Sequence, residues 1–207
     1  MARVLLLCTG NICRSPIAEG FLRQMLADRG IGGVEVESAG VSGLDGYPAM
    51  PEAVTALIER HVDISPHLAR RLERRMAESA DLVVTMSSSH REALVRMAPA
   101  AAGRTFTLKE LVHLLGQRED ASPRGGPGDR IGAAAAAADN LRRAGAADDL
   151  VDEDIPDPLG LGQEAFRAVA WQIEVLTERL VEELFGPAED GSASGPAGVV
   201  TKESGLR

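Results

Sequence analysis

A cysteine and an arginine lie six residues apart in one short segment, Cys8-Thr9-Gly10-Asn11-Ile12-Cys13-Arg14-Ser15. The apolar run at residues 4–7 before it is typical of a buried strand, and a helical pattern follows it. Backbone N–H groups and the partial positive charge of a helix N-terminus converge at such a junction and favour an anion. A Cys8 thiolate and the Arg14 guanidinium would face a tetrahedral oxyanion there. The segment therefore predicts nucleophilic attack on phosphorus.

The surroundings of the pair decide between two interpretations. A Cys and an Arg at this spacing are a weak pattern alone, since Cys8 could be a small core residue and Arg14 a surface charge. Gly10 and Asn11 tolerate the positive φ angles that a phosphate-binding loop requires. The strand-to-helix junction and these two residues favour the catalytic interpretation.

The residue types also predict roles. Cys8 would attack phosphorus in line and form a phosphocysteine, while Arg14 would bind two equatorial oxygens. The Ser15 hydroxyl could donate a hydrogen bond to the thiolate, and loop amides would complete the cradle. Because these groups already supply positive charge, we expect no metal and no cofactor. The predicted phosphate-binding loop comprises Thr9, Gly10, Asn11, Ile12, Cys13 and Ser15.

The segment resembles the active-site motif of the low-molecular-weight protein tyrosine phosphatases, a hydrophobic strand followed by Cys-x5-Arg-Ser with Gly and Asn inside the loop. A second likeness is the pair Asp157-Pro158, and others are residues 37–40, 67–70 and 80–86. The resemblance covers residues 3–116 and 150–185 in the same order. It implies hydrolysis of phosphotyrosine in a phosphorylated protein substrate.

Asp157 is the predicted general acid and base. A phenolate leaves faster with a proton, because its conjugate acid has a pKa of about 10. Asp157 would donate that proton and later activate the water that hydrolyses the phosphocysteine. The alternative is that Asp152, Glu153, Asp154 and Asp157 form a solvated acidic stretch. The family arrangement of Asp157-Pro158 favours the acid role.

Cys13 has two interpretations. As a second thiol it could form a reversible disulfide with Cys8, which the resemblance favours, or it could simply pack beneath the loop. We expect Ser38 to support the loop by a hydrogen bond to Asn11.

Three other polar residues receive general expectations. His67 and Arg70 are expected in a supporting polar network, and no function is expected of His90.

The substrate preference depends on apolar residues. Leu44, Tyr47 and Leu159 are candidate walls of the substrate slot, although aromatic residues are scarce. At Ile12, a β-branched apolar side chain suits a flat aromatic group, whereas a small hydroxyl residue would suit the phosphoguanidinium of the related protein-arginine phosphatases.

Three alternatives to a tyrosine phosphatase remain open. A protein-arginine phosphatase is the nearest. An arsenate reductase would need further cysteines beyond Cys8 and Cys13. A non-catalytic phosphoprotein-binding module would be expected to lack Cys8 or Asp157.

Composition agrees with a single cytoplasmic domain that is a monomer or weak dimer. The 207 residues are 44% hydrophobic, enough to form a sizeable core, and the net charge of −9 argues against nucleic-acid binding. The apolar runs are too short to span a membrane. Two cysteines cannot form a disulfide framework, which favours a reducing compartment.

The periodicity predicts an α/β fold: a twisted, mainly parallel four-stranded sheet with helices on both faces and the phosphate-binding loop after the first strand. Expected strands are 4–7, 34–38, 82–85 and 105–107. Expected helices are 17–29, 51–61, 72–77, 89–98, 108–115 and 163–185.

Two segments fall outside this pattern. Within the domain at residues 1–186, residues 117–149 are interpreted as an insertion, with a solvent-facing helical piece at 133–138. Residues 187–207 are expected to be a disordered tail.

Overall fold

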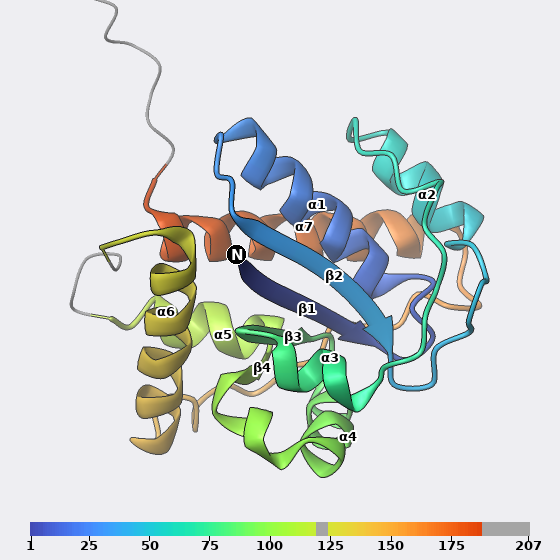
Figure 1. Ribbon diagram of the computed structural model, residues 1–207. Helices are drawn as coiled ribbons and strands as arrows, with labels where there is room; N and C mark the ends of the chain where they lie inside the picture. The colour runs from blue at the N-terminus through green and yellow to red at the C-terminus, as the bar shows by residue number, and fades with distance from the viewer. Residues whose placement is uncertain (119–123, 188–207) are drawn as a thin grey trace, which may run out of the picture.

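The computed structural model describes residues 1–118 and 124–187 of the chain. Its four strands form one parallel sheet in the order β2-β1-β3-β4 (Figure 1). None of the helices in these residues is long and apolar enough to cross a membrane. The strands are β1 (Ala2–Cys8), β2 (Val34–Gly40), β3 (Leu82–Thr85) and β4 (Thr105–Thr107). The helices are α1 (Arg14–Asp28), α2 (Pro51–Ile58), α3 (Arg74–Ser79), α4 (Ser88–Met97), the 3-10 helix η1 (Pro99–Arg104), α5 (Leu108–Leu115), α6 (Pro127–Arg143) and α7 (Gln163–Phe185).

Strand β1 is central and carries the predicted nucleophile at its carboxyl end. It pairs with β2 along its whole length, up to Cys8 opposite Gly40, and with β3 on its other edge. A strand that is covered on both faces needs apolar residues throughout, and the run at residues 4–7 meets this requirement.

Helices cover both faces of the sheet, as predicted. Val4 and Leu6 point into the larger core, which they share with α1, α2, α5, α6 and α7. Leu5 and Leu7 point the other way, into a smaller core with α3, α4 and η1. Alternate side chains of β1 therefore pack against different layers of helices. These layers lie on opposite sides of the sheet (Figure 1).

Helix α6 corrects one expectation. The residues at 133–138 are helical, but the prediction that this piece faces solvent is wrong. Ala134, Ala135 and Ala138 are buried together with Ile131, at the i, i+3, i+4, i+7 spacing of a core-facing stripe. Small side chains let α6 lie close to its neighbours α5, η1 and α7.

The ends of several other helices differ by a few residues from the predicted ranges. Helix α1 begins at Arg14, three residues before the expected start, so that the end of the phosphate-binding loop is also the first turn of the helix. Helix α2 ends at Ile58, and α3 begins at Arg74, two residues later than expected. Apart from Pro187, the predicted tail lies outside the described residues.

Candidate active site

The segment between β1 and α1 wraps around the sulfur of Cys8. The Ser15 hydroxyl oxygen lies 3.0 Å from the Cys8 Sγ, and the backbone N–H of Asn11 donates to the same sulfur at 3.3 Å. Asn11 has a φ of 59°, in the left-handed region that asparagine tolerates better than most residues. The loop thus turns sharply enough to bring backbone and hydroxyl donors to one thiol.

The carbonyl groups of the loop are engaged by groups outside it. Four consecutive carbonyl oxygens accept hydrogen bonds from segments that follow β2. Because the C=O and N–H of a trans peptide point in opposite directions, carbonyls that bond outward turn the N–H groups of the following residues inward, as an anion cradle requires. The pairs are Thr9 O with Ser42 N (2.9 Å), Gly10 O with Leu44 N (3.1 Å), Asn11 O with His67 Nε2 (2.8 Å) and Ile12 O with Met50 N (2.8 Å).

The side chain of Asn11 connects the loop to the rest of the domain. Its Nδ2 donates to the hydroxyls of Ser15 (3.0 Å) and Ser38 (2.8 Å). Its Oδ1 accepts from the backbone N–H of Arg70 at 2.9 Å. The expected hydrogen bond between Ser38 and Asn11 is therefore present, and His67 and Arg70 both belong to the supporting network.

A buried carboxylate completes this network and was not predicted. The Ser38 hydroxyl donates to Glu19, which also pairs with Arg23 at 2.7 Å. Glu19 lies one turn into α1, so the sequence alone shows a helical residue of ordinary type. Only the packing of α1 on β2 brings it to Ser38.

His90 contacts the loop, although no function was expected of it. Its Nε2 lies 2.9 Å from Thr9 Oγ1 and its Nδ1 lies 2.7 Å from Ser87 Oγ. Burial, reinforced by the positive charge of Arg14, lowers the pKa of His90 from its ordinary value near 6.5 to about 4. At neutral pH the imidazole is uncharged and bridges the loop to the start of α4. The sequence signal was its position three residues after the cap Ser87, at the carboxyl edge of the sheet.

Arg14 and Asp157 meet across 143 positions of sequence. Arg14 Nη1 donates to the carbonyl oxygen of Ile155 at 3.0 Å, and Nη2 donates to Asp157 Oδ2 at 2.6 Å. The guanidinium is buried while the carboxylate is half exposed. The buried Nε of Arg14 has no hydrogen-bond partner within the two described ranges. Arg14 is thus held at the pocket, and its Nε–H remains available as a donor.

Both groups open onto a pocket of about 180 Å³ above the loop. Leu44 and Leu159 line it, as predicted for a substrate slot, and Ser42 lines it without having been predicted. The side chain of Tyr47 is 62% exposed and is not part of this lining, so the structure does not bring the third predicted wall residue to the pocket. The lining residues are Cys8, Thr9, Gly10, Ile12, Cys13, Arg14, Ser42, Leu44, Asp157 and Leu159.

The second cysteine differs from the first in its surroundings. Burial, together with the nearby Cys8 and Asp157, raises the pKa of Cys13 to about 12. Cys8 and Cys13 are both free thiols in this structure. Cys13 is therefore a neutral thiol at physiological pH, and it lines the same pocket as Cys8.

The part of the chain that the structure describes holds no cluster of three or more His, Cys, Asp or Glu side chains arranged to bind a metal ion. The polar groups around the pocket are instead amides, hydroxyls, one guanidinium and one carboxylate. Such a set can bind a phosphoryl group and exchange protons with it.

Comparison with known proteins identifies this arrangement. Residues 3–122 match the family model described as low molecular weight phosphotyrosine protein phosphatase. Over 108 residues, 52% of this chain and 71% of the relative, the chain is 41% identical to the "Probable low molecular weight protein-tyrosine-phosphatase EpsP" of Ralstonia nicotianae. Over 182 residues, 88% of this chain and 95% of the relative, it is 31% identical to a protein-arginine-phosphatase of Geobacillus stearothermophilus.

A solved structure extends the likeness to the fold. The crystal structure of the low molecular weight protein tyrosine phosphatase from T. tengcongensis superposes with a TM-score of 0.66 at 33% identity, over 89% of this chain and 100% of that one. The sequence motif, the geometry of the loop and these likenesses agree. The chain therefore belongs to the low molecular weight phosphotyrosine protein phosphatase family.

Proposed function

We propose that the protein hydrolyses phosphotyrosine in protein substrates, with Cys8 as nucleophile, Arg14 as phosphate clamp and Asp157 as general acid and base. The observation that carries the proposal is the loop itself. Its carbonyl groups are satisfied from outside, while a backbone amide donates to the Cys8 sulfur and the Ser15 hydroxyl lies within hydrogen-bond distance of it. Arg14 and Asp157 share the pocket with that sulfur.

In the first step the Cys8 thiolate attacks phosphorus, and the bond between phosphorus and the tyrosine oxygen breaks. The loop amides and Arg14 stabilise the charge on the three equatorial oxygens. Asp157 donates its proton to the departing phenolate oxygen, so that neutral tyrosine leaves. The products of this step are a phosphocysteine and the Asp157 carboxylate.

In the second step a water molecule attacks the phosphocysteine. The Asp157 carboxylate accepts a proton from the water as the new phosphorus–oxygen bond forms. The bond between phosphorus and sulfur breaks, and Cys8 leaves as a thiolate that the Ser15 hydroxyl stabilises. Inorganic phosphate is released and Asp157 is again protonated for the next turnover.

Substrate binding must rearrange the ion pair between Arg14 and Asp157. A phosphate dianion in the loop carries more charge than the half-exposed carboxylate and competes for Arg14. Once Arg14 turns to the phosphate oxygens, Asp157 loses its ion-pair partner, takes up a proton from solvent and faces the leaving oxygen as an acid. The pair seen here therefore represents the resting arrangement of the two groups.

A protein-arginine phosphatase is the second candidate, because the Geobacillus relative with that name matches 88% of this chain. The lining of the pocket favours tyrosine instead. Ile12, Leu44 and Leu159 present apolar surface, which suits a phenyl ring better than a charged guanidinium.

A panel of phosphorylated peptides tests the proposal. Wild type and Cys8→Ser would be assayed on phosphotyrosine and phosphoarginine peptides in the presence of EDTA. We expect wild type to release phosphate mainly from phosphotyrosine. Cys8→Ser should release none, yet it should still bind vanadate because the loop amides and Arg14 remain. Release mainly from phosphoarginine would replace the substrate assignment, and release by Cys8→Ser would reject the mechanism.

A further inference from the structure

The segment that carries Asp157 has no regular secondary structure, so its position depends on side-chain anchors. Asp157 itself is half exposed, and its carboxylate contacts Arg14 and the backbone N–H of Leu159. Of these two contacts, the one with Arg14 is lost when the substrate phosphate binds Arg14. The Leu159 N–H that remains belongs to the same segment, so the placement of the Asp157 carboxylate during catalysis depends on what holds this segment to the other elements.

The upstream acidic residues each contact a group on another element, although Asp152 is itself exposed. Asp152 pairs with Lys109 at 2.8 Å, and Asp154 Oδ1 accepts from the backbone N–H of Ser88 at 2.7 Å. Asp152 and Asp157 are exposed, as the alternative of a solvated acidic stretch expects, but the stretch is also tied to the fold by these contacts. Each anchor lies on a different helix, which ties the segment to α4 and α5.

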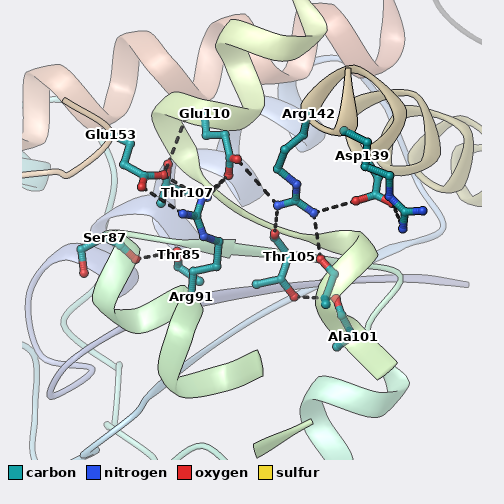
Figure 2. Close-up of polar contacts among 12 residues, drawn as sticks. Thr85, Ser87, Arg91, Ala101, Thr105, Thr107, Glu110, Asp139, Arg142 and Glu153 are labelled. Atoms are coloured by element: carbon teal, nitrogen blue, oxygen red, sulfur yellow. Dashed lines mark hydrogen bonds and ion pairs between the residues drawn. The ribbon is translucent and has the colours of Figure 1, made fainter. Parts of the chain in front are cut away.

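Glu153, between Asp152 and Asp154, makes more hydrogen bonds to other elements than either neighbour. Arg91 on α4 donates hydrogen bonds to Glu153 from both terminal nitrogens, Nη1 to Oε2 at 2.7 Å and Nη2 to Oε1 at 3.0 Å (Figure 2). The hydroxyl of Thr107 donates to the same carboxylate at 3.3 Å. A two-pronged arginine–carboxylate contact fixes orientation as well as distance.

Arg91 is in turn held by a buried carboxylate. Its Nη1 lies 2.6 Å from Glu110, whose side chain is 4% exposed. Glu110 forms a capping box with Thr107 at the start of α5, and Arg142 of α6 lies 3.7 Å away on its other side. Figure 2 shows this row of alternating charges from Glu153 to Arg142. It connects α6, α5 and α4 with the segment that carries the acid.

We propose that the Arg91–Glu153 pair, backed by Glu110, is a positioning device for Asp157. The inference rests on the proposed acid role of Asp157 and adds the residues that aim it. Four positions separate Glu153 from Asp157, and Ile155 between them donates its backbone N–H to the carbonyl oxygen of Met86 at 2.8 Å. When Arg14 turns to the phosphate, these contacts keep the carboxyl group of Asp157 at the leaving oxygen.

The test uses Glu153→Gln and two substrates that differ in their need for a proton. A phosphotyrosine peptide has a poor leaving group, and 2,4-dinitrophenyl phosphate has a good one. We expect kcat/KM, which reports formation of the phosphocysteine and not its hydrolysis, to fall about tenfold on the peptide and less than about twofold on the activated ester, because only the poor leaving group needs a well-placed acid. Competitive inhibition by inorganic phosphate should be unchanged. The matched control is Glu92→Gln, which alters an exposed pair with Arg96 on the same helix and should change neither rate.

A double variant separates positioning from general structural support. In an Asp157→Ala background, Glu153→Gln should have no further effect on the peptide if Glu153 acts through Asp157. Arg91→Lys, which keeps the charge but loses the fork, should show the same substrate split as Glu153→Gln.

Two other results are informative. Equal loss on both substrates, or a loss that persists without Asp157, would overturn the inference while leaving the proposed function intact. If Asp157→Ala itself did not discriminate between the two substrates, the acid role would be wrong and the inference would fall with it.

Discussion

At the scale of single residues, Cys8 and Cys13 show how strongly the surroundings of two nearby thiols can differ. Cys8 and Cys13 are five positions apart and both are buried. Cys8 accepts a hydrogen bond from the backbone N–H of Asn11, and its sulfur lies 3.0 Å from the Ser15 hydroxyl oxygen. For Cys13, burial is the largest of the causes that raise its pKa to about 12.

This contrast predicts selective alkylation. Iodoacetate at pH 7.5 should modify Cys8 and leave Cys13 unmodified in the native protein, because the thiolate is the reactive form and Cys13 is protonated there. Peptide mapping by mass spectrometry after brief exposure measures both sites. The unfolded protein is the control, in which both cysteines should react. Modification of Cys13 in the native protein would show that its surroundings do not suppress ionisation.

The sequence predicted the residues of the loop but not all of their partners. Cys8, Arg14 and Ser15 are contiguous in one motif, so their neighbourhood could be read from the sequence. Glu19 and His90 have ordinary types in ordinary helices. Their roles depend on which helix face packs against the loop, and this is settled by tertiary structure.

At the scale of elements, helix α6 shows how an alanine-rich segment can be part of the core. Ala134 is fully buried, whereas Ala136 two positions later is exposed. We expect Ala134→Asp to lower the free energy of unfolding by about 3 kcal/mol or more, because it buries an unpaired charge. Ala136→Asp should change it by less than about 1 kcal/mol.

Urea denaturation of the two variants measures the difference. Similar stability of both would mean that α6 does not pack on the domain through this face. The same experiment distinguishes a structural helix from the solvent-facing piece that the sequence suggested.

Elements with strong periodicity were predicted well, and the others less so. The bounds of β3, β4, α5 and α7 agree with the predicted ranges. The burial of α6 was missed because alanine has high helix propensity with or without tertiary contacts, so composition does not reveal which face is covered.

At the scale of the whole molecule, His90 couples the pH of the solution to stability. Its pKa is about 4 in the folded state and near 6.5 when exposed. As pH falls from 7 toward 4, the unfolded chain therefore binds the proton first, and the folded state loses stability. The loss attributable to His90 should be on the order of 2 kcal/mol by pH 4.5.

His90→Gln isolates that contribution, because it removes the titrating group and keeps hydrogen-bonding capacity. Free energies of unfolding measured from pH 7 to pH 4.5 should fall less steeply for the variant than for wild type. Parallel curves would mean that His90 is not held neutral in the folded protein.

The place of Cys8 at the end of the central strand has a consequence for how the enzyme gains and loses activity. The groups that shape its loop come from β2, from residues 67–70, from α4 and from the segment before α7, so the site draws on positions from 8 to 157. Individual helices can form while any one of these contacts is missing. During refolding, turnover should therefore return with the final docking step and lag behind the recovery of helical circular dichroism. Activity in this protein reports the completion of the tertiary fold rather than the amount of secondary structure.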